Sequence, residues 1–141
     1  MNDDFPSMLA VQQGFESTPP VDFETAVSDG FESIKHRLTP GMSVAVGVGS
    51  RGVSNLSKIV SLVIAELKKA GTEPFIIPAM GSHGGAAPEG QLELLAGYGV
   101  TEESMGVPIR PSMEVAPLGE SAAGREAVSY THLTLPTICS V

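Results

Sequence analysis

Several residue types are scarce in this sequence, and each scarcity excludes a class of protein. The 141 residues include one cysteine, no tryptophan, and 8 Lys and Arg against 16 Asp and Glu. With Cys139 alone, the chain forms neither an internal disulfide nor a multi-cysteine metal site. The excess of acidic residues argues against a nucleic-acid-binding protein, which normally presents a basic face.

Long apolar runs are missing as well. No run approaches the about 20 residues that a membrane-spanning helix needs. The acidic residues 1–4 lead into no long apolar segment, so we expect no secretory signal. These features predict a cytoplasmic enzyme domain, or a piece of one, without a nucleic-acid or membrane partner.

Two segments in the middle of the chain repeat the same pattern of an apolar strand, a glycine-rich loop and a helix. In the first unit, the strand, loop and helix occupy residues 44–48, 49–54 and 55–70. In the second unit, they occupy residues 74–80, 81–85 and 88–96. Strands that alternate with helices at this spacing predict an α/β fold with a parallel sheet.

The flanking segments carry weaker patterns. Asp22 is placed to cap a helix whose apolar stripe runs through residues 23–38. Residues 9–13 resemble an edge strand. In the helix of the second unit, we expect Leu92 and Leu95 to face the sheet.

Each glycine-rich loop carries one conspicuous polar side chain, Arg51 in the first and His83 in the second. Parallel strands end at one edge of a sheet, where ligands bind in such folds, so both residues should lie there. A guanidinium can hold a carboxylate or phosphate through two parallel hydrogen bonds, and an imidazole can exchange a proton near neutral pH. The pair suits a small hydroxy or keto acid. The alternatives are an arginine that is solvated or caps a helix, and a histidine with a structural role.

A second interpretation comes from the glycines of the first loop. Gly47, Gly49 and Gly52 have the spacing of a dinucleotide-binding fingerprint between a strand and a helix. Such sites place an acidic residue after the second strand, whereas residues 80–83 are Met-Gly-Ser-His. A dinucleotide-binding oxidoreductase domain remains the alternative function. In a third interpretation, the glycines only make turns in a non-catalytic module.

Both loops resemble the N-terminal domain of the nickel-pincer lactate racemase family. Residues 48–54 (VGSRGVS) and 78–86 (PAMGSHGGA) carry the match, and the similarity covers residues 5–124. The resemblance implies the substrate-binding and acid–base half of a two-domain isomerase, a racemase acting on a 2-hydroxy acid. It also implies a nickel-pincer nucleotide cofactor that accepts a hydride from the substrate.

The resemblance assigns roles to single residues. His83 matches the catalytic acid–base histidine. Where better-known members carry Asp and Pro, this chain has Val48 and Gly52, which indicates a divergent branch with a different 2-hydroxy acid. The residues implied to bind substrate or cofactor anions are Arg51, Ser50, Ser82, Gly49, Gly81 and Gly84.

Other parts of the implied enzyme are expected outside this chain. The cofactor-bearing lysine, the nickel ligand and the second catalytic histidine belong to later family segments, so no metal residue is assigned here. The partner of this chain would be the missing C-terminal domain, and the fragment alone should be inactive.

The last residues differ in character. Residues 128–141 include no charged side chain, and residues 129–137 resemble the peptide obtained when a sequencing adapter is translated. We therefore expect an incomplete α/β first domain over residues 1–124 and an artefactual, unstructured tail over residues 125–141. His132 and Cys139 would then have no function.

Overall fold

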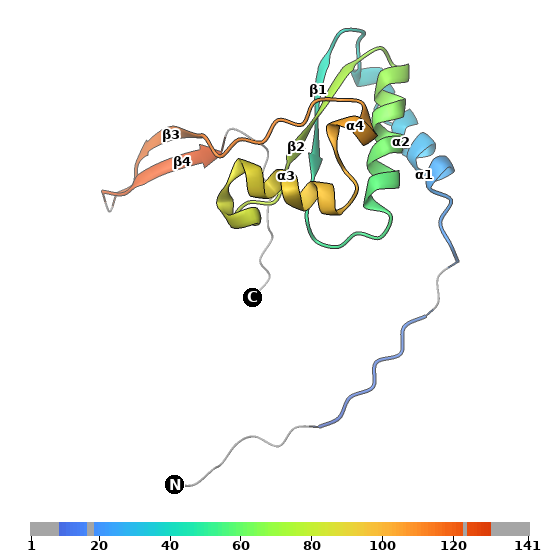
Figure 1. The fold of residues 1–141 in the computed structure, drawn as a ribbon, viewed down its shortest axis with the longest axis horizontal. Coiled ribbons are helices and arrows are strands. Elements are labelled where there is room, and N and C mark those ends of the chain that lie inside the picture. The colour runs from blue at the N-terminus through green and yellow to red at the C-terminus, as the bar shows by residue number, and fades with distance from the viewer. Residues whose placement is uncertain (1–8, 17–18, 123, 131–141) are drawn as a thin grey trace.

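A parallel pair of strands lies at the centre of the fold (Figure 1). The computed structural model describes residues 9–16, 19–122 and 124–130. In chain order, the elements are α1 (Phe23–Glu32), the 3-10 turn η1 (Lys35–Arg37), β1 (Ser43–Val48), α2 (Leu56–Lys69), β2 (Glu73–Pro78), the 3-10 turn η2 (Gly84–Ala86), α3 (Pro88–Gly97), α4 (Glu102–Met105), β3 (Val115–Glu120) and β4 (Glu126–Tyr130).

The small sheet has the parallel topology that the sequence predicts. β1 and β2 pair in parallel along their whole length, from Ser43 opposite Glu73 to Val48 opposite Pro78. On its other side, β2 forms a parallel bridge between Ile76 and Ile109. β2 therefore lies between two neighbours, which explains why most of its side chains are buried. This confirms a mixed α/β fold.

Two helices pack together beside the strands. Figure 1 shows α1 and α2 side by side. Nζ of Lys58 in α2 forms an ion pair with Oε1 of Glu24 in α1 at 3.5 Å. The predicted N-cap is confirmed, because the Asp22 carboxylate accepts a hydrogen bond from the Glu24 N–H at 3.2 Å. An apolar cavity of about 400 Å³ lies between α1, β1 and α2, and no residue of the two glycine-rich loops lines it.

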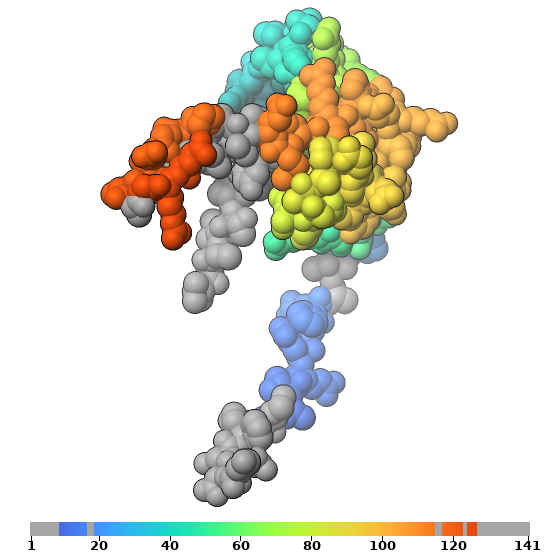
Figure 2. Space-filling view, turned by 60° about the vertical axis from the view of Figure 1, so that its left-hand side comes forward, coloured from blue at the N-terminus to red at the C-terminus, as the bar shows by residue number. Residues whose placement is uncertain are grey.

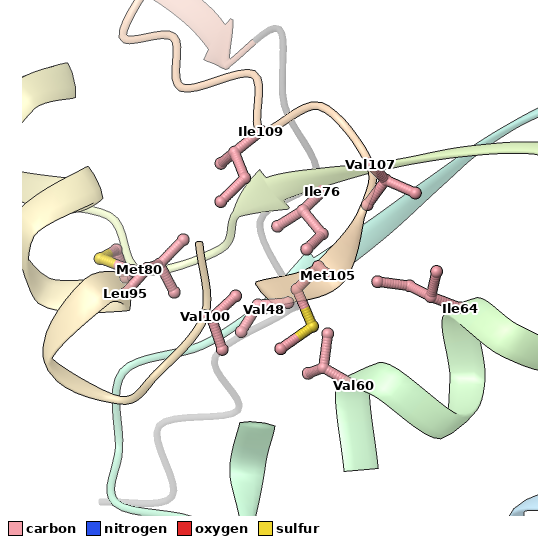
Figure 3. Packing of buried hydrophobic residues seen from close by; sticks show 10 residues of the cluster. All are labelled: Val48, Val60, Ile64, Ile76, Met80, Leu95, Val100, Met105, Val107 and Ile109. Atoms are coloured by element: carbon pink, nitrogen blue, oxygen red, sulfur yellow. The ribbon is translucent and has the colours of Figure 1, made fainter. Parts of the chain in front are cut away.

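The core forms where α2, α3 and α4 meet β2 (Figure 3). Ile76 of β2 and Leu95 of α3 are fully buried. α4 is a single turn whose Thr101 and Ser104 cap each other, and it brings Met105 into the same cluster. The buried members of the cluster are Val48, Val60, Ile64, Ile76, Met80, Leu95, Val100, Met105, Val107 and Ile109.

The inward face of α3 differs from the prediction. Leu95 is buried as expected, but Leu92 is 37% exposed, so its predicted burial is wrong. The second buried residue of the helix is Gln91, with 0% exposure. Gln91 and Leu95 are four positions apart and therefore share one helical face. Leu92 is three positions before Leu95 and lies at the edge of the same face, where it remains 37% exposed.

A β-hairpin follows the core and extends beyond it (Figure 1). β3 and β4 pair antiparallel across a turn in which the Gly124 N–H bonds to the Ser121 carbonyl at 2.9 Å. Gly124 has φ +68°, which glycine adopts without strain. The prediction of an unstructured tail from residue 125 is therefore wrong for β4. Residues 131–141, with His132 and Cys139, lie outside the described residues.

The segment before α1 is extended and solvent-exposed. Residues 9–16 form no strand, so the predicted edge strand is wrong, and Figure 2 shows this segment running away from the body. Leu9, Val11 and Phe15 are each more than 80% exposed, so no packing holds a strand in place. Among the described residues, none of the helices has the length and apolar character needed to cross a membrane.

Candidate functional site

The two glycine-rich loops leave the same edge of the sheet, as predicted. One loop joins β1 to α2 and the other joins β2 to α3, and the two strands run parallel. Beyond the last strand pair, the Ala79 N–H still bonds to the Val48 carbonyl at 2.8 Å. This backbone contact fixes the starting points of both loops next to each other.

A hydrogen bond between side chains joins the two loops. Ser50 Oγ bonds to Nδ1 of His83, 33 residues further along the chain. Ser50 is half-buried and His83 is exposed. Nε2 of His83 has no hydrogen-bond partner among the described residues. The structure therefore presents an imidazole that is oriented at one nitrogen and open at the other.

Tyr98, at the end of α3, supports the first loop. Its hydroxyl donates a hydrogen bond to the carbonyl of Ser50 at 3.0 Å, and its side chain is half-buried. This residue was not predicted from the sequence. In the sequence, Tyr98 stands between two glycines at a helix end, but its hydrogen-bond partner Ser50 is 48 residues away and no local pattern connects the two.

Two glycines allow the second loop to pack directly on α3. A Cβ on Gly84 would lie 2.4 Å from the carbonyl carbon of Gly90, and a Cβ on Gly90 would lie 2.0 Å from the Gly84 carbonyl oxygen. Real Cβ atoms do not approach so closely, so both positions require glycine. This packing gives a structural reason for a glycine at position 84, the residue to which the resemblance assigns anion binding. Gly90 is a structural residue that the sequence analysis missed.

Gln91 anchors the second loop from inside the protein. Its Nε2 donates to the carbonyl of Gly81 at 3.0 Å and contacts Sδ of Met113 at 3.3 Å. Its Oε1 is buried and has no hydrogen-bond partner in the described structure. Gln91 was not predicted from the sequence, although its position four residues before Leu95 places it on the core face of α3.

Arg51 follows Ser50 directly and therefore lies in the loop that contacts His83. It is exposed, and among the described residues its guanidinium has no hydrogen bond or ion pair. Ser82 precedes His83 and is also exposed. The structure thus brings Arg51, Ser50, Ser82 and His83 to one edge of the sheet, without a hydrogen bond between Arg51 and His83.

The remaining predicted glycines lie in the same region. Gly49 directly follows β1, and a Cβ there would be 3.8 Å from the Ala79 carbonyl oxygen. Gly81 has φ +56° and begins the turn that leads to His83. Both glycines therefore help to shape the loops.

The glycines of the alternative fingerprint have different surroundings. Gly47 lies inside β1, opposite Ile77. Gly52 has φ +62° in an open loop, with no atom within 4 Å of a Cβ built there. In the dinucleotide fingerprint, the last glycine permits close packing between helix and strand. Gly52 precedes the first residue of α2 by four positions and makes no such contact.

The described part of the chain offers neither a clustered metal site nor a lysine on the two loops for the nickel-pincer cofactor that the resemblance implies. Within the described part of the chain, no three His, Cys, Asp or Glu side chains gather as a metal site. None of the four lysines lies on either loop, and each already has a polar partner. Lys35 pairs with Glu32, Lys58 with Glu24 and Lys69 with Glu66, and Lys68 donates to the Gly106 carbonyl.

Comparison with known proteins adds no assignment to this geometry. No protein-family model matches the chain, and neither a curated protein nor a solved structure matches it.

Proposed function

We propose that the two loops form the substrate-binding and acid–base site of a lactate-racemase-like isomerase that acts on a 2-hydroxy acid. The hydrogen bond between Ser50 and His83 is the observation that supports this proposal most directly. It joins the two loops that carry the family resemblance, although they are far apart in the sequence. A purely structural role for each loop would not require this contact.

His83 would exchange the proton of the substrate hydroxyl through Nε2. A neutral imidazole carries one proton, and the hydrogen bond at one nitrogen influences which nitrogen holds it. The Ser50 hydroxyl can donate to Nδ1 or accept from it, so it can serve both protonation states of the ring. A positioned acid–base group of this kind typically contributes about 10²–10⁴-fold to a rate.

Arg51 would hold the carboxylate of the same substrate. Its guanidinium is exposed, and among the described residues it has no acidic partner that would compete with a ligand. A planar guanidinium binds a carboxylate through two parallel hydrogen bonds, which orient the acid as well as attract it. Ser50 of the first loop bonds to His83 of the second. The carboxylate of one small molecule would then meet the Arg51 guanidinium, and its hydroxyl would meet the His83 imidazole.

The resemblance assigns hydride transfer to the nickel-pincer cofactor. We assign to this chain only the handling of the proton and of the carboxylate, because the resemblance places the cofactor-bearing lysine and the nickel ligand in later segments. We propose that a C-terminal domain outside this chain supplies the remaining groups. The chain alone would then bind the acid without racemising it.

Titration of the chain with lactate and other small 2-hydroxy acids, followed by proton–nitrogen NMR of the backbone amides, tests the binding role. We expect the signals of residues 49–52 and 81–84 to shift in a saturable way. Arg51→Gln should abolish the shifts, because it removes the charge that holds the carboxylate. Arg125→Gln, which alters an exposed arginine in the hairpin, is the matched control and should leave them unchanged.

Propionate, which lacks the hydroxyl, separates the two roles. His83→Gln should weaken the binding of lactate and leave the binding of propionate unchanged. Lactate shifts that spare both loops, or that survive Arg51→Gln, would contradict the proposal. Saturable shifts with NAD at the first loop would favour the dinucleotide-binding alternative instead.

Turnover tests the acid–base role in a protein that carries both halves. His83→Ala should lower racemisation by about 10²–10⁴-fold, because it removes the proton-exchanging group. His83 is exposed on a loop, so circular dichroism should show an unchanged fold. Near-normal turnover of this variant would refute the acid–base assignment.

A further inference from the structure

We propose that Gln91 is a positioning residue for His83, which it holds in place through the carbonyl of Gly81. This inference rests on the proposed function, because it explains how the acid–base group is oriented. Gln91 lies within α3, and among the described residues it makes hydrogen bonds to the Gly81 carbonyl and Met113 Sδ but none to the imidazole. Its side chain instead bonds to the turn from which His83 projects.

The hydrogen bond from Gln91 is made to the central peptide group of that turn. The His83 N–H bonds to the carbonyl of Met80 at 3.2 Å, so residues 80–83 form a β-turn. Gly81 is the first central residue of the turn and has φ +56°. Its carbonyl belongs to the central peptide, whose plane can rotate between turn types. The 3.0 Å bond from Gln91 Nε2 holds that plane in one orientation.

The burial of Gln91 indicates that its amide has a specific use. The side chain has 0% exposure, and its Oε1 lacks a hydrogen-bond partner. A buried polar atom without a partner reduces stability, and an apolar side chain of similar shape would avoid that cost. Position 91 thus carries an amide that is unfavourable for stability alone, and its donor reaches the loop of His83.

A second contact fixes the other side of the loop. The backbone of Gly84, directly after His83, packs on Gly90 of α3 so closely that neither residue accepts a Cβ. His83 is therefore held between a hydrogen bond at Gly81 and a backbone contact at Gly84, both made by adjacent residues of one helix. With both ends fixed, the ring is positioned to meet Ser50 Oγ.

Histidine-ring NMR of the chain, at a pH where neutral imidazoles dominate, tests this proposal. We expect the His83 ring nitrogens to show one fixed tautomer, whereas the exposed His36 shows averaging. His83→Gln identifies the signals. Gln91→Met removes the amide and keeps an unbranched side chain of similar size. It should leave the thermal midpoint unchanged or raised, while His83 loses its fixed tautomer and resembles His36.

The matched control is Glu93→Gln, an exposed position on the same helix, and it should leave the His83 ring signals unchanged. A folded Gln91→Met protein with unchanged His83 signals would overturn the proposal. That result would not affect the proposed function, which the lactate titration tests separately. Conversely, loss of the tautomer in a chain that binds no 2-hydroxy acid would support the positioning role and contradict the function.

A measurement on the unsubstituted chain covers the case in which Gln91→Met does not fold. The Nε2 protons of Gln91 should exchange with solvent at least about tenfold more slowly than those of Gln12 and Gln13, because buried, hydrogen-bonded groups are protected. Gln12 and Gln13 lie in the exposed segment before α1 and serve as internal references. Equal exchange rates at all three residues would overturn the proposal.

Discussion

Replacement of Gly90 by alanine tests the packing on which the second loop depends. In an ordinary helix, this substitution raises stability by about 1 kcal/mol, because alanine has the higher helix propensity. At this position, the new Cβ would lie 2.0 Å from the carbonyl oxygen of Gly84 and 2.7 Å from its carbonyl carbon. The structure therefore predicts the opposite sign.

The size of the effect follows from what would have to move. Both obstructing atoms belong to the backbone, so no side-chain rotation relieves the contact. The loop and α3 would have to separate by more than about 1 Å, which resembles overpacking and costs about 1–3 kcal/mol. This cost exceeds the gain from helix propensity, so Gly90→Ala should be less stable than the wild type.

Gly97→Ala provides the matched control on the same helix. No atom lies within 4 Å of a Cβ at Gly97, so only the favourable propensity term applies. Urea denaturation followed by circular dichroism should place the free energies of unfolding of the two variants about 2 kcal/mol apart, with Gly97→Ala the more stable. A Gly90→Ala protein at least as stable as the wild type would refute the close approach of loop and helix.

Two further predictions concern the core and the first helix. Leu95→Ala should lower the free energy of unfolding by about 2–5 kcal/mol, because the Leu95 side chain is fully buried. Leu92 is exposed, so Leu92→Ala should lower it by less than about 1 kcal/mol. Equal losses of the two variants in denaturant titrations would contradict the assigned helix face. Hydrogen bonds from the Thr25 hydroxyl and the Glu24 N–H lower the pKa of Asp22 below its usual value. The stabilisation from this carboxylate should therefore be complete above the unfolded pKa and lost as the pH falls through the lower folded pKa. NMR titration of the carboxyl group should give this lowered pKa, and Asp22→Asn should make the helix content less dependent on pH in acid, whereas an unshifted pKa would refute the cap.

Local patterns in the sequence were enough to predict the central elements. The apolar runs identified β1 and β2, and the helix between them was predicted within one residue of each observed end. Asp22 was recognised as an N-cap because capping depends on residues only a few positions apart. The common edge of the two loops also followed, because parallel strands joined by a helix end on the same side.

Predictions that depended on distant contacts were less successful. α3 was expected to bury Leu92, but the helix turns Gln91 toward the core instead. Leu92 and Leu95 have the i, i+3 spacing of one helical face, so the local pattern gave no sign that Gln91 is buried more fully than Leu92. β4 was missed because its pairing with β3 depends on a turn at Gly124, where the composition suggested an unstructured tail.

The sequence by itself determined the order of strands, loops and helices, and it placed Arg51 and His83 on one edge of the sheet. Only the tertiary structure showed that Ser50 meets His83, that Gly84 lies against Gly90, and that a buried amide holds the turn at Gly81. Secondary structure depends on neighbours within a few positions, whereas these contacts depend on how α3 is oriented against two loops from separate parts of the chain.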